Sequence, residues 1–413
     1  MVSNKESKGK SRALQGVKVA DFSWVVVGPV TSMMLAHHGA QVIRIESLTR
    51  PDPTRAIPPM KDGIRGMNRA GVYADYNSNK YGLGLDLNHP KGVEVAKKII
   101  AWADVVIESF SPGTMEKKWG LGYEDIKKIK PEIIMLSTSM VGQTGPAARS
   151  IGFGVELISL IGFNHFVGWP DRGPTPLLTA YSDFLTPPIG VVAVMAALET
   201  RLKTGKGQWI DLSQFEVSLQ YLAPALLDYS VNRHDVGRKG NYHCRVAPHG
   251  AYRCKGDDRW CVISVFTDEE WQTFCRLIGK PAWSEDPEFA SLLGRKKRED
   301  ELNRLIEEWT INYMPEEIVD LLQANGIAAG TIEDGKDVLG DPQLKHRRHF
   351  IALNHPEMEQ YMTEAAPFQL SKTPSEVHMP APCLGEHTEH VCTQILGLSD
   401  EEFVELLSEG VLN

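Results

Sequence analysis

The sequence predicts an α/β fold with a Rossmann-like large domain, built on a parallel sheet, and a smaller α+β domain. Two observations support this prediction. In the first third of the chain, short apolar runs typical of buried strands alternate with segments typical of helices, as in parallel sheets with crossover helices. After residue 229 the pattern changes to a hairpin followed by several helices, which indicates a second domain.

The elements of the large domain follow from local patterns in chain order. Strands are predicted for the apolar runs at 17–22, 41–46, 104–108, 133–137 and 208–212. Helices are predicted between them at 30–38, 90–102 and 123–129, and a long apolar helix at 213–229. We expect a disordered tail at 1–13 and the first part of the large domain at 14–229.

The small domain is placed at 230–330. A hairpin is predicted from 250–254 and 259–265 around the turn at 255–258. Helices follow at 268–278, 298–312 and 315–325, and Gly326 ends the last of them. Residues 331–413 remain as a linker and a C-terminal segment.

Composition excludes several classes of protein. The 413 residues are 42% apolar and carry a net charge of −9, which gives no basic footprint for nucleic acid. Six cysteines have no CxxC spacing and no paired His/Cys pattern, so we expect free thiols, a cytoplasmic location and no metal. We expect no signal peptide, because the N-terminal residues are polar and have no apolar core, and no membrane span, because apolar runs of about ten residues are too short to cross a membrane.

A nicotinamide or flavin cofactor is not expected. The segment after the first predicted strand reads Val27-Gly28-Pro29 in place of the GxGxxG fingerprint of dinucleotide-binding folds. Proline in place of the second glycine removes an N–H donor and blocks close approach of a pyrophosphate.

Asp183 is the candidate catalytic residue. It precedes a helix that is predicted to begin at Pro187, with Thr186 as N-cap. Free backbone N–H groups and the helix dipole would hold such a carboxylate ionised, and an ionised carboxylate can act as a nucleophile. The alternative is an ordinary turn or cap aspartate.

Segments along most of the chain resemble the class III family of CoA-transferases, of the formyl-CoA and carnitine CoA-transferase type. They lie, in order and spacing, at 14–23, 27–29, 38–46, 79–80, 85–87, 103–113, 196–208 and 381–388. By this resemblance Asp183 falls at the catalytic aspartate of the family. The resemblance also implies that 331–413 returns to the large domain, and that the protein is an interlocked homodimer or pairs with a homologous subunit.

A CoA site needs cations for phosphates and apolar walls for adenine and pantetheine. Basic candidates stand near the ends of predicted strands, where ligands of parallel sheets bind: Arg44, Lys80, Lys117, Lys118 and Arg149. The resemblance adds residues in the segments that line the CoA site of the family: Val25, Val26, Asn79, Lys80, Ser109, Phe110 and Lys117. For any single lysine, a solvated surface position is the alternative.

An aromatic loop precedes Asp183. Phe163, His165 and Trp169 are candidates for a pocket that holds an apolar or aromatic acid, and His249 for an acid or base. Packing in the domain core or a dimer interface is the alternative for the loop, and a structural histidine beside a turn glycine for His249.

The predicted function is transfer of CoA from an acyl-CoA, with succinyl-CoA as a family-level donor, to a carboxylic acid. The route is an aspartyl-CoA thioester and mixed anhydrides at Asp183. One alternative is a 2-methylacyl-CoA racemase, which shares this fold but needs a His and an Asp; here Gly154 stands where that aspartate would be. Another is a CoA-binding, non-catalytic subunit of a hetero-oligomeric transferase.

Overall fold

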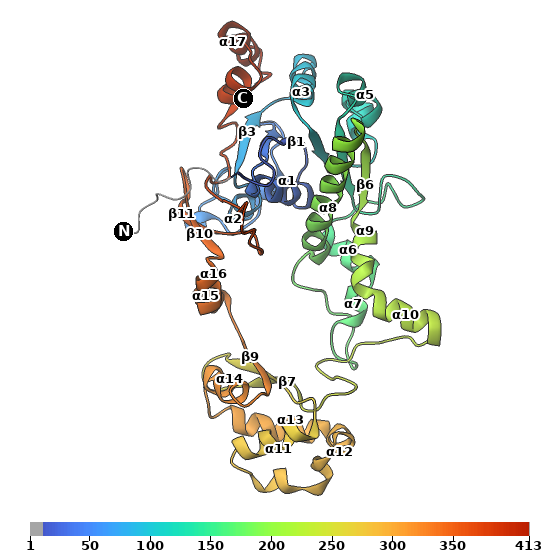
Figure 1. Cartoon of the computed structure of the whole chain (residues 1–413), viewed down its shortest axis with the longest axis vertical. Coiled ribbons are helices and arrows are strands. Elements are labelled where there is room, and N and C mark those ends of the chain that lie inside the picture. The colour runs from blue at the N-terminus through green and yellow to red at the C-terminus, as the bar shows by residue number, and fades with distance from the viewer. Residues whose placement is uncertain (1–10, 413) are drawn as a thin grey trace. The chain divides into compact units, whose positions relative to one another are not determined.

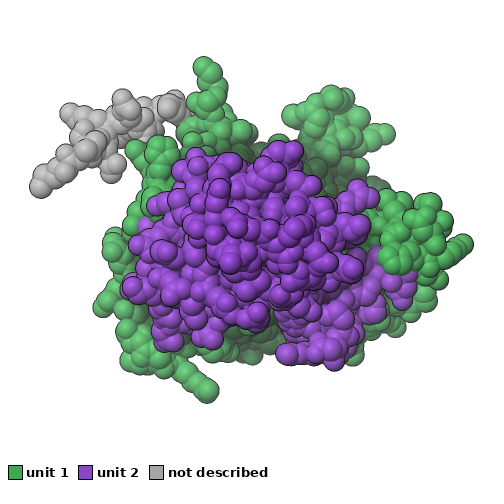
Figure 2. Space-filling view, turned by 90° about the horizontal axis from the view of Figure 1, so that it is seen from below, with its two compact units in different colours: residues 1–163, 177–234, 342–413 green, residues 164–176, 235–341 purple. Residues whose placement is uncertain are grey.

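The computed structural model describes residues 11–412, which form two compact units (Figures 1 and 2). The described part of the first unit consists of residues 11–163, 177–234 and 342–412, and the second unit of 164–176 and 235–341. The sequence analysis placed the corresponding boundaries at 230 and 330 and did not assign 164–176 to the second unit. Most of the predicted tail, 1–13, lies outside the described residues.

A six-stranded parallel sheet forms the centre of the first unit (Figure 1). Its strand order is β3-β2-β1-β4-β5-β6, that of a doubly wound nucleotide-binding fold, so the predicted α/β class is confirmed. The order reverses between β1 and β4, and ligands of such folds bind outside the carboxyl ends of the strands at this point. The strands are β1 Lys18–Asp21, β2 Gln41–Glu46, β3 Lys80–Gly84, β4 Val105–Glu108, β5 Ile134–Ser139 and β6 Trp209–Ser213.

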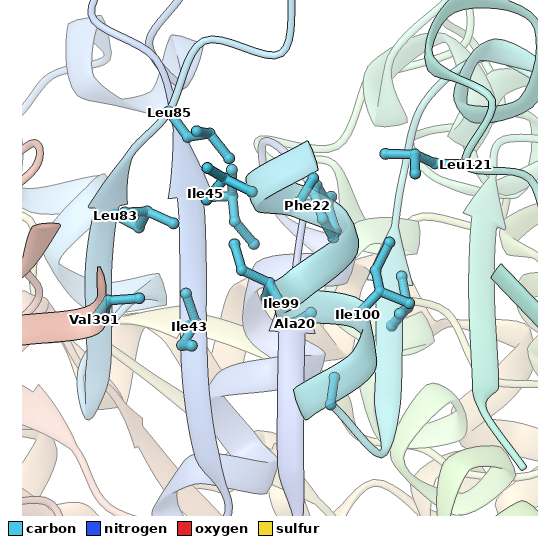
Figure 3. Packing of buried hydrophobic residues seen from close by; sticks show 14 of the residues in the cluster. Ala20, Phe22, Ile43, Ile45, Leu83, Leu85, Ile99, Ile100, Leu121 and Val391 are labelled. Carbon is cyan, nitrogen blue, oxygen red and sulfur yellow. The ribbon is translucent and has the colours of Figure 1, made fainter. Parts of the chain in front are cut away.

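Apolar side chains on both faces of the sheet are buried by helices, as expected of parallel strands. On one face Ile99 and Ile100 of α3 cover Ala20 and Ile43 (Figure 3). On the other face Val194 of α8 belongs to the cluster around the alternate strand residues. The helices before residue 234 are α1 Val27–His37, α2 Gly71–Tyr76, α3 Pro90–Trp102, α4 Thr114–Trp119, α5 Tyr123–Ile129, α6 Gly154–Ile161, α7 Phe163–Phe166, α8 Tyr181–Thr204, α9 Gln214–Leu219 and α10 Ala223–Asn232.

The C-terminal segment of the first unit covers the edge strand β3. Asn79 N–H donates to the Met379 carbonyl at 2.9 Å, and His387 N–H donates to the Gly82 carbonyl at 2.9 Å. Val391 joins the core beneath the sheet (Figure 3). This segment carries α16 Pro342–Arg347, the hairpin of β10 Phe350–His355 and β11 Glu359–Glu364, a π-helical turn at His390–Ile395, and α17 Asp400–Ser408.

The second unit is a small α+β domain, as its sequence pattern predicts. An antiparallel sheet with the order β7-β8-β9 packs against helices around Phe274, Leu302 and Leu322. Its elements are β7 His249–Arg253, β8 Trp260–Ser264, β9 Ala328–Ile332, α11 Asp268–Leu277, α12 Leu292–Lys297, α13 Glu299–Thr310, α14 Pro315–Gln323 and α15 Gly335–Gly340.

Two helices differ from the prediction. The helix expected to begin at Pro187 begins at Tyr181, and both prolines lie inside it. Because Pro187 and Pro188 have no N–H, the carbonyls four residues earlier lose their helical partners, yet the packed helix continues. The helix expected at 213–229 is divided into α9, a single turn at Gln220–Leu222, and α10.

Helix α8 is longer than the apolar run that predicted it, and this matters for whether it could cross a membrane. By length and composition alone α8 could span a bilayer, whereas the sequence analysis counted an apolar run of only about ten residues. In the structure 44% of the apolar window is buried, and α8 packs against α1, α6 and α9. Core helices of soluble domains pass the same test.

Candidate active site

Asp183 lies in the first turn of α8, as the third helical residue after the N-cap Ala180. Only 9% of its surface is exposed. Burial raises the pKa of the carboxyl from 3.8 to about 6, although a hydrogen bond from Ser182 acts in the opposite direction. The carboxylate therefore stays ionised at neutral pH, but it is less well solvated and more basic than an ordinary aspartate.

Gly154, the first residue of α6, lies directly against the Asp183 carboxylate. A Cβ atom built on Gly154 would be 2.5 Å from Asp183 Oδ1 and 2.5 Å from the Ala180 Cβ atom. Only glycine fits without displacing the carboxylate. The first N–H groups of a helix lack intrahelical partners and carry partial positive charge, so the start of α6 is a favourable neighbour for an anion.

A cavity of about 800 Å³ contains Asp183 and lies at the carboxyl ends of β1, β4 and β5. This volume is within the range of small-molecule and cofactor sites. Its wall includes residues 24–27 after β1, 109–114 after β4, 138–140 from the end of β5, 148–154 before α6, and Lys117, Lys118 and Gln214.

Five of the predicted CoA-binding residues line this cavity together with Asp183: Val25, Val26, Ser109, Phe110 and Lys117. Four of them come from the segments directly after β1 and β4, the two strands that flank the switch point, and Lys117 comes from α4, which follows β4. Ser109 ties the two loops together, because its Oγ accepts from Trp24 N–H at 2.8 Å and donates to the Trp24 carbonyl at 3.1 Å.

Arg44 and Lys80 do not line the cavity; both are fully buried and paired with carboxylates. Lys80 Nζ lies 3.1 Å from Asp21 Oδ2, and Arg44 pairs with both Asp21 and Asp52. Burial opposes these charges, but Lys80 and Arg44 hold the pKa of Asp21 down at about 2. In this structure the two cations are therefore structural, beneath the site and without a free surface for phosphate.

Asn79 also lies outside the cavity. Its Nδ2 donates to the Glu376 carbonyl at 2.6 Å, and its Oδ1 accepts from His378 and Met379 N–H at 3.0 Å each. The side chain therefore binds the C-terminal segment to the start of β3, and Asn79 has the left-handed conformation that asparagine tolerates.

A second cavity of about 160 Å³ shares Trp24, Phe110, Thr114 and Lys118 with the first. Four aromatic residues line it, and three of them are in edge contact: the rings of Trp24 and Phe110 lie 5.6 Å apart, and those of Phe110 and Trp119 lie 5.3 Å apart; the fourth is Phe22. Lys118 Nζ is 4.9 Å from the Trp119 ring centroid, and Arg50 stands on the wall. Trp24, Trp119 and Arg50 were not predicted from the sequence, although a tryptophan directly after a predicted strand, as at Trp24, is a usable signal.

Polar groups without partners stand at the end of β5. Thr138 Oγ1 and Ser139 Oγ are buried and have no hydrogen-bond partner among the described residues. Both residues line the cavity that holds Asp183, as does Gln214. Buried hydroxyls are normally satisfied, so these two are available to a polar ligand group.

The predicted acid pocket is divided between the two units. Phe163 belongs to the first unit, where its ring lies 6.4 Å from that of Tyr181. Trp169 packs within the second unit, 5.8 Å from the ring of Tyr242, and a Cβ atom on Gly240 would meet its indole at 2.4 Å. Trp169 thus has a packing role within that unit.

The two histidines that the sequence analysis proposed for the site, His165 and His249, lie in the second unit and have local partners. His165 lies 3.9 Å from a carboxylate oxygen of Asp235, and its carbonyl accepts from Arg238 at 3.1 Å. His249 begins β7, and its Nδ1 lies 2.8 Å from the Asn241 carbonyl. Within residues 11–412, no group of three or more His, Cys, Asp or Glu side chains is placed to hold a metal ion.

The pKa of Asp183 gives a prediction for pH dependence. An attacking carboxylate must be ionised, so the transfer rate should rise with pH and level off above about 6, falling about tenfold per unit below that value. Initial rates with saturating and with low acyl-CoA, between about pH 4.5 and 8, measure the break. A break near 4, the ordinary value for aspartate, would contradict the assignment.

The sheet, the cavity at its switch point and the buried carboxylate are features typical of an α/β enzyme, with the cavity at the carboxyl ends of β1 and β4. A family model described as CoA-transferase family III matches residues 14–388, and the chain belongs to this family. Members are CoA-transferases, which use CoA thioesters as substrates.

Individual relatives are also CoA-transferases or members of a related structural family. The chain is 30% identical to succinyl-CoA–D-citramalate CoA-transferase of Chloroflexus aurantiacus, over 98% of this chain and 100% of that protein. It is 31% identical to the succinyl-CoA–L-malate CoA-transferase beta subunit of the same organism, over 97% and 98%. Its structure is similar to that of a CAIB/BAIF family protein from Brucella suis, with a TM-score of 0.86, 29% identity, and coverage of 94% of this chain and 100% of that one.

Proposed function

We propose that this enzyme transfers CoA from an acyl-CoA to a free carboxylic acid through covalent catalysis by Asp183. The single observation that supports this most is the buried carboxylate in the wall of a cavity large enough for an acyl-CoA. Burial makes the carboxylate a stronger base, and the Gly154 position lets it lie at the start of α6 without obstruction.

The proposed sequence of steps keeps every atom accounted for. The Asp183 carboxylate attacks the donor thioester carbonyl and expels CoA thiolate, which leaves a mixed anhydride of Asp183 and the donor acid. The thiolate then attacks the aspartyl carbonyl and releases the donor carboxylate, giving an aspartyl-CoA thioester. The acceptor carboxylate enters by the same two steps in reverse. No net proton transfer is needed.

CoA recognition is proposed along the two cavities, which share wall residues. Lys117, Lys118 and Arg149 supply cations for the phosphates, because all three line the larger cavity. The aromatic group of Trp24, Phe110 and Trp119 offers stacking surfaces for adenine, with Trp119 Nε1 buried and unpartnered among the described residues. The thioester end is then directed towards Asp183.

The racemase alternative finds less support. A racemase needs two groups to exchange the α-proton. The residue next to Asp183 at the start of α6 is Gly154, and its missing Cβ leaves the space that the carboxylate occupies. A non-catalytic subunit would have no need to keep a buried carboxylate at an energetic cost.

A trapping experiment tests the covalent step. Incubation with donor acyl-CoA, without acceptor, should leave an adduct on the peptide that contains Asp183, because no acceptor carboxylate is then present to carry the covalent intermediate on to product. Hydroxylamine should convert that side chain to a hydroxamate and borohydride should reduce it, both with loss of activity. Protein that has not met the donor should resist both reagents. Turnover without any donor-dependent mass change at Asp183 would rule the mechanism out.

For the acceptor we propose a carboxylic acid with a second oxygen-bearing group, with succinyl-CoA as donor. The unpartnered hydroxyls of Thr138 and Ser139 in the wall beside Asp183 support this, and so do the polar acids in the names of the two relatives above. The aromatic loop had suggested an apolar acid, but Trp169 is packed against Tyr242 and Gly240.

A substrate panel decides between the two acceptor classes. Succinyl-CoA should be combined with malate, citramalate, glutarate and oxalate, and with benzoate and phenylacetate as aromatic acids. We expect kcat/KM for the best polar acid to exceed that for the best aromatic acid by at least about 100-fold, because unpaired buried hydroxyls discriminate against groups that cannot bond to them. The reverse order would contradict the proposal.

A homodimer in the cytoplasm is proposed as the working state. Apolar side chains on α8 and α10 are exposed in the single chain, including Val192, Leu202, Leu227 and Val231, and a partner would cover them. One relative is named as a beta subunit, so a homologous second chain is the alternative. Light scattering of the purified chain distinguishes these cases.

The six free cysteines support the proposed cytoplasmic location, because thiols stay reduced in a reducing compartment.

A further inference from the structure

The turn between β1 and α1 contains a backbone conformation that valine rarely adopts. Val25 has φ of 70°, in the left-handed region, where a β-branched side chain is strained. The neighbouring residues Val26 and Val27 lead into α1, and all three valines line the cavity that holds Asp183. Strained residues of this kind persist only where their surroundings hold them in place.

The carboxylate of Asp52 holds this turn. Val25 N–H donates to Asp52 Oδ2 at 3.0 Å, across 27 residues of sequence. Asp52 is 1% exposed, and its other oxygen, Oδ1, accepts from the N–H and the hydroxyl of Thr54 at 2.8 and 2.7 Å. The two oxygens therefore have separate partners: Oδ1 caps the turn at Pro53–Ala56, and Oδ2 holds Val25.

Arg44 fixes the position of Asp52 and of the turn at once. Its guanidinium pairs with Asp52 Oδ2 and also donates to the Ser23 carbonyl, two residues before Val25. The turn is tight at this point, because a Cβ atom on Gly28 would lie 2.2 Å from the side chain of Ser23. Ser23, Val25 and Gly28 thus have little freedom once Arg44 and Asp52 are in place.

From this arrangement we infer that Asp52 is a positioning residue for the reaction at Asp183. It keeps Val25 left-handed, so that the first N–H groups of α1, at Val26 and Val27, stand at the wall of the reaction cavity. These N–H groups have no intrahelical partners and suit a developing oxyanion. The inference rests on the proposed role of Asp183, because it assigns Asp52 to that same site.

The decisive experiment compares Asp52→Asn in two backgrounds, the natural chain and the Val25→Gly variant. Asparagine keeps Oδ1 as a cap for Thr54, but its NH₂ group can accept neither from Val25 N–H nor from the Arg44 guanidinium. Glycine adopts the left-handed conformation without strain. We expect Asp52→Asn to lower kcat/KM at least about tenfold with Val25 present, and less than about threefold with glycine there. Thr54→Val, which touches only the Oδ1 side, is the matched control.

Crystal structures of the same variants give a readout that does not depend on activity. In Asp52→Asn alone Val25 should leave the left-handed region, and in the double variant residue 25 should keep it. Equal losses of kcat/KM in both backgrounds, or an unchanged turn in Asp52→Asn, would overturn the inference.

The remaining outcomes are also assigned. If Asp52→Asn fails to fold but the double variant folds, the inference is supported; if neither folds, Asp52 serves the fold independently of Val25 and the inference is wrong. Failure of the proposed function would look different, because the unmodified enzyme would then form no adduct at Asp183.

Discussion

Replacing Asp183 with asparagine is expected to abolish measurable CoA transfer, a loss of at least about 10⁴-fold, without unfolding the protein. Asparagine has nearly the shape of aspartate, so it fits beside Gly154 and in the first turn of α8. It cannot form the anhydride or the thioester, and no adduct should appear on its peptide. Transfer by a folded variant within tenfold of the natural enzyme would exclude Asp183 as the nucleophile.

The same substitution should increase stability at neutral pH. The folded-state pKa of about 6 lies above the ordinary value of 3.8, so the folded protein holds this proton more tightly than the unfolded chain. The stabilisation that comes with the protonated form is present below about 3.8 and is lost as pH rises through about 6. Above pH 6 the ionised carboxylate costs up to about 3 kcal/mol, which a neutral amide removes.

Asp75→Asn is the matched control. Asp75 belongs to the same unit and does not line the Asp183 cavity, but burial, with a contribution from Glu364, raises the pKa of its carboxyl to about 6 as well. Its replacement should stabilise the protein in the same pH range and leave transfer intact. Thermal unfolding at about pH 5 and 8, with activity assays on both variants, separates a catalytic carboxylate from one that is merely buried.

Gly154→Ala is expected to lower the transfer rate by about 100-fold, because a methyl group 2.5 Å from Asp183 Oδ1 must displace the nucleophile. The loss should fall mainly on kcat, since the substitution does not touch Lys117 and Phe110, the residues proposed to contact CoA. Overpacking should also lower the free energy of unfolding by about 1–3 kcal/mol.

Gly335→Ala controls for the loss of glycine itself. Gly335 is also the first residue of a helix, α15, and a Cβ atom there would have no heavy atom within 4 Å. This variant should be fully active. Steady-state kinetics and thermal unfolding of the two alanine variants make the comparison, and an active Gly154→Ala enzyme would show that the carboxylate can move without cost.

The sequence predicted most of the sheet because buried parallel strands are continuous apolar runs. β2, with Val42, Ile43 and Ile45 in its centre, is an example. β3 was not predicted, since Lys80-Tyr81-Gly82-Leu83-Gly84 contains a lysine and two glycines. Lys80 can be buried there only because Asp21 of β1 lies two strands away in the sheet, and a pairing across 59 residues leaves no local pattern.

The candidate site also contains contacts between residues that are distant in sequence and that no local pattern could predict. Asp183, Val25 and Phe110 fall in one cavity, at the positions suggested by the family resemblance. Arg44 and Lys80 were predicted to bind CoA phosphates because a sequence does not show whether a basic residue is already paired. Their carboxylate partners become neighbours only after folding. The start of α8 was misplaced because Thr186 and two prolines form a typical helix beginning, whereas tertiary packing lets the helix run through them.

The covering of β3 by residues 376–412 has a consequence for biosynthesis. The ribosome completes all six strands and the whole second unit before it makes the segment that bonds to Gly82 and Asp86. Until then one side of the nascent sheet offers unpaired N–H and carbonyl groups to other chains. We therefore expect the incomplete chain to be more prone to aggregation than the finished protein until residues 376–412 have been made and have bonded to this edge.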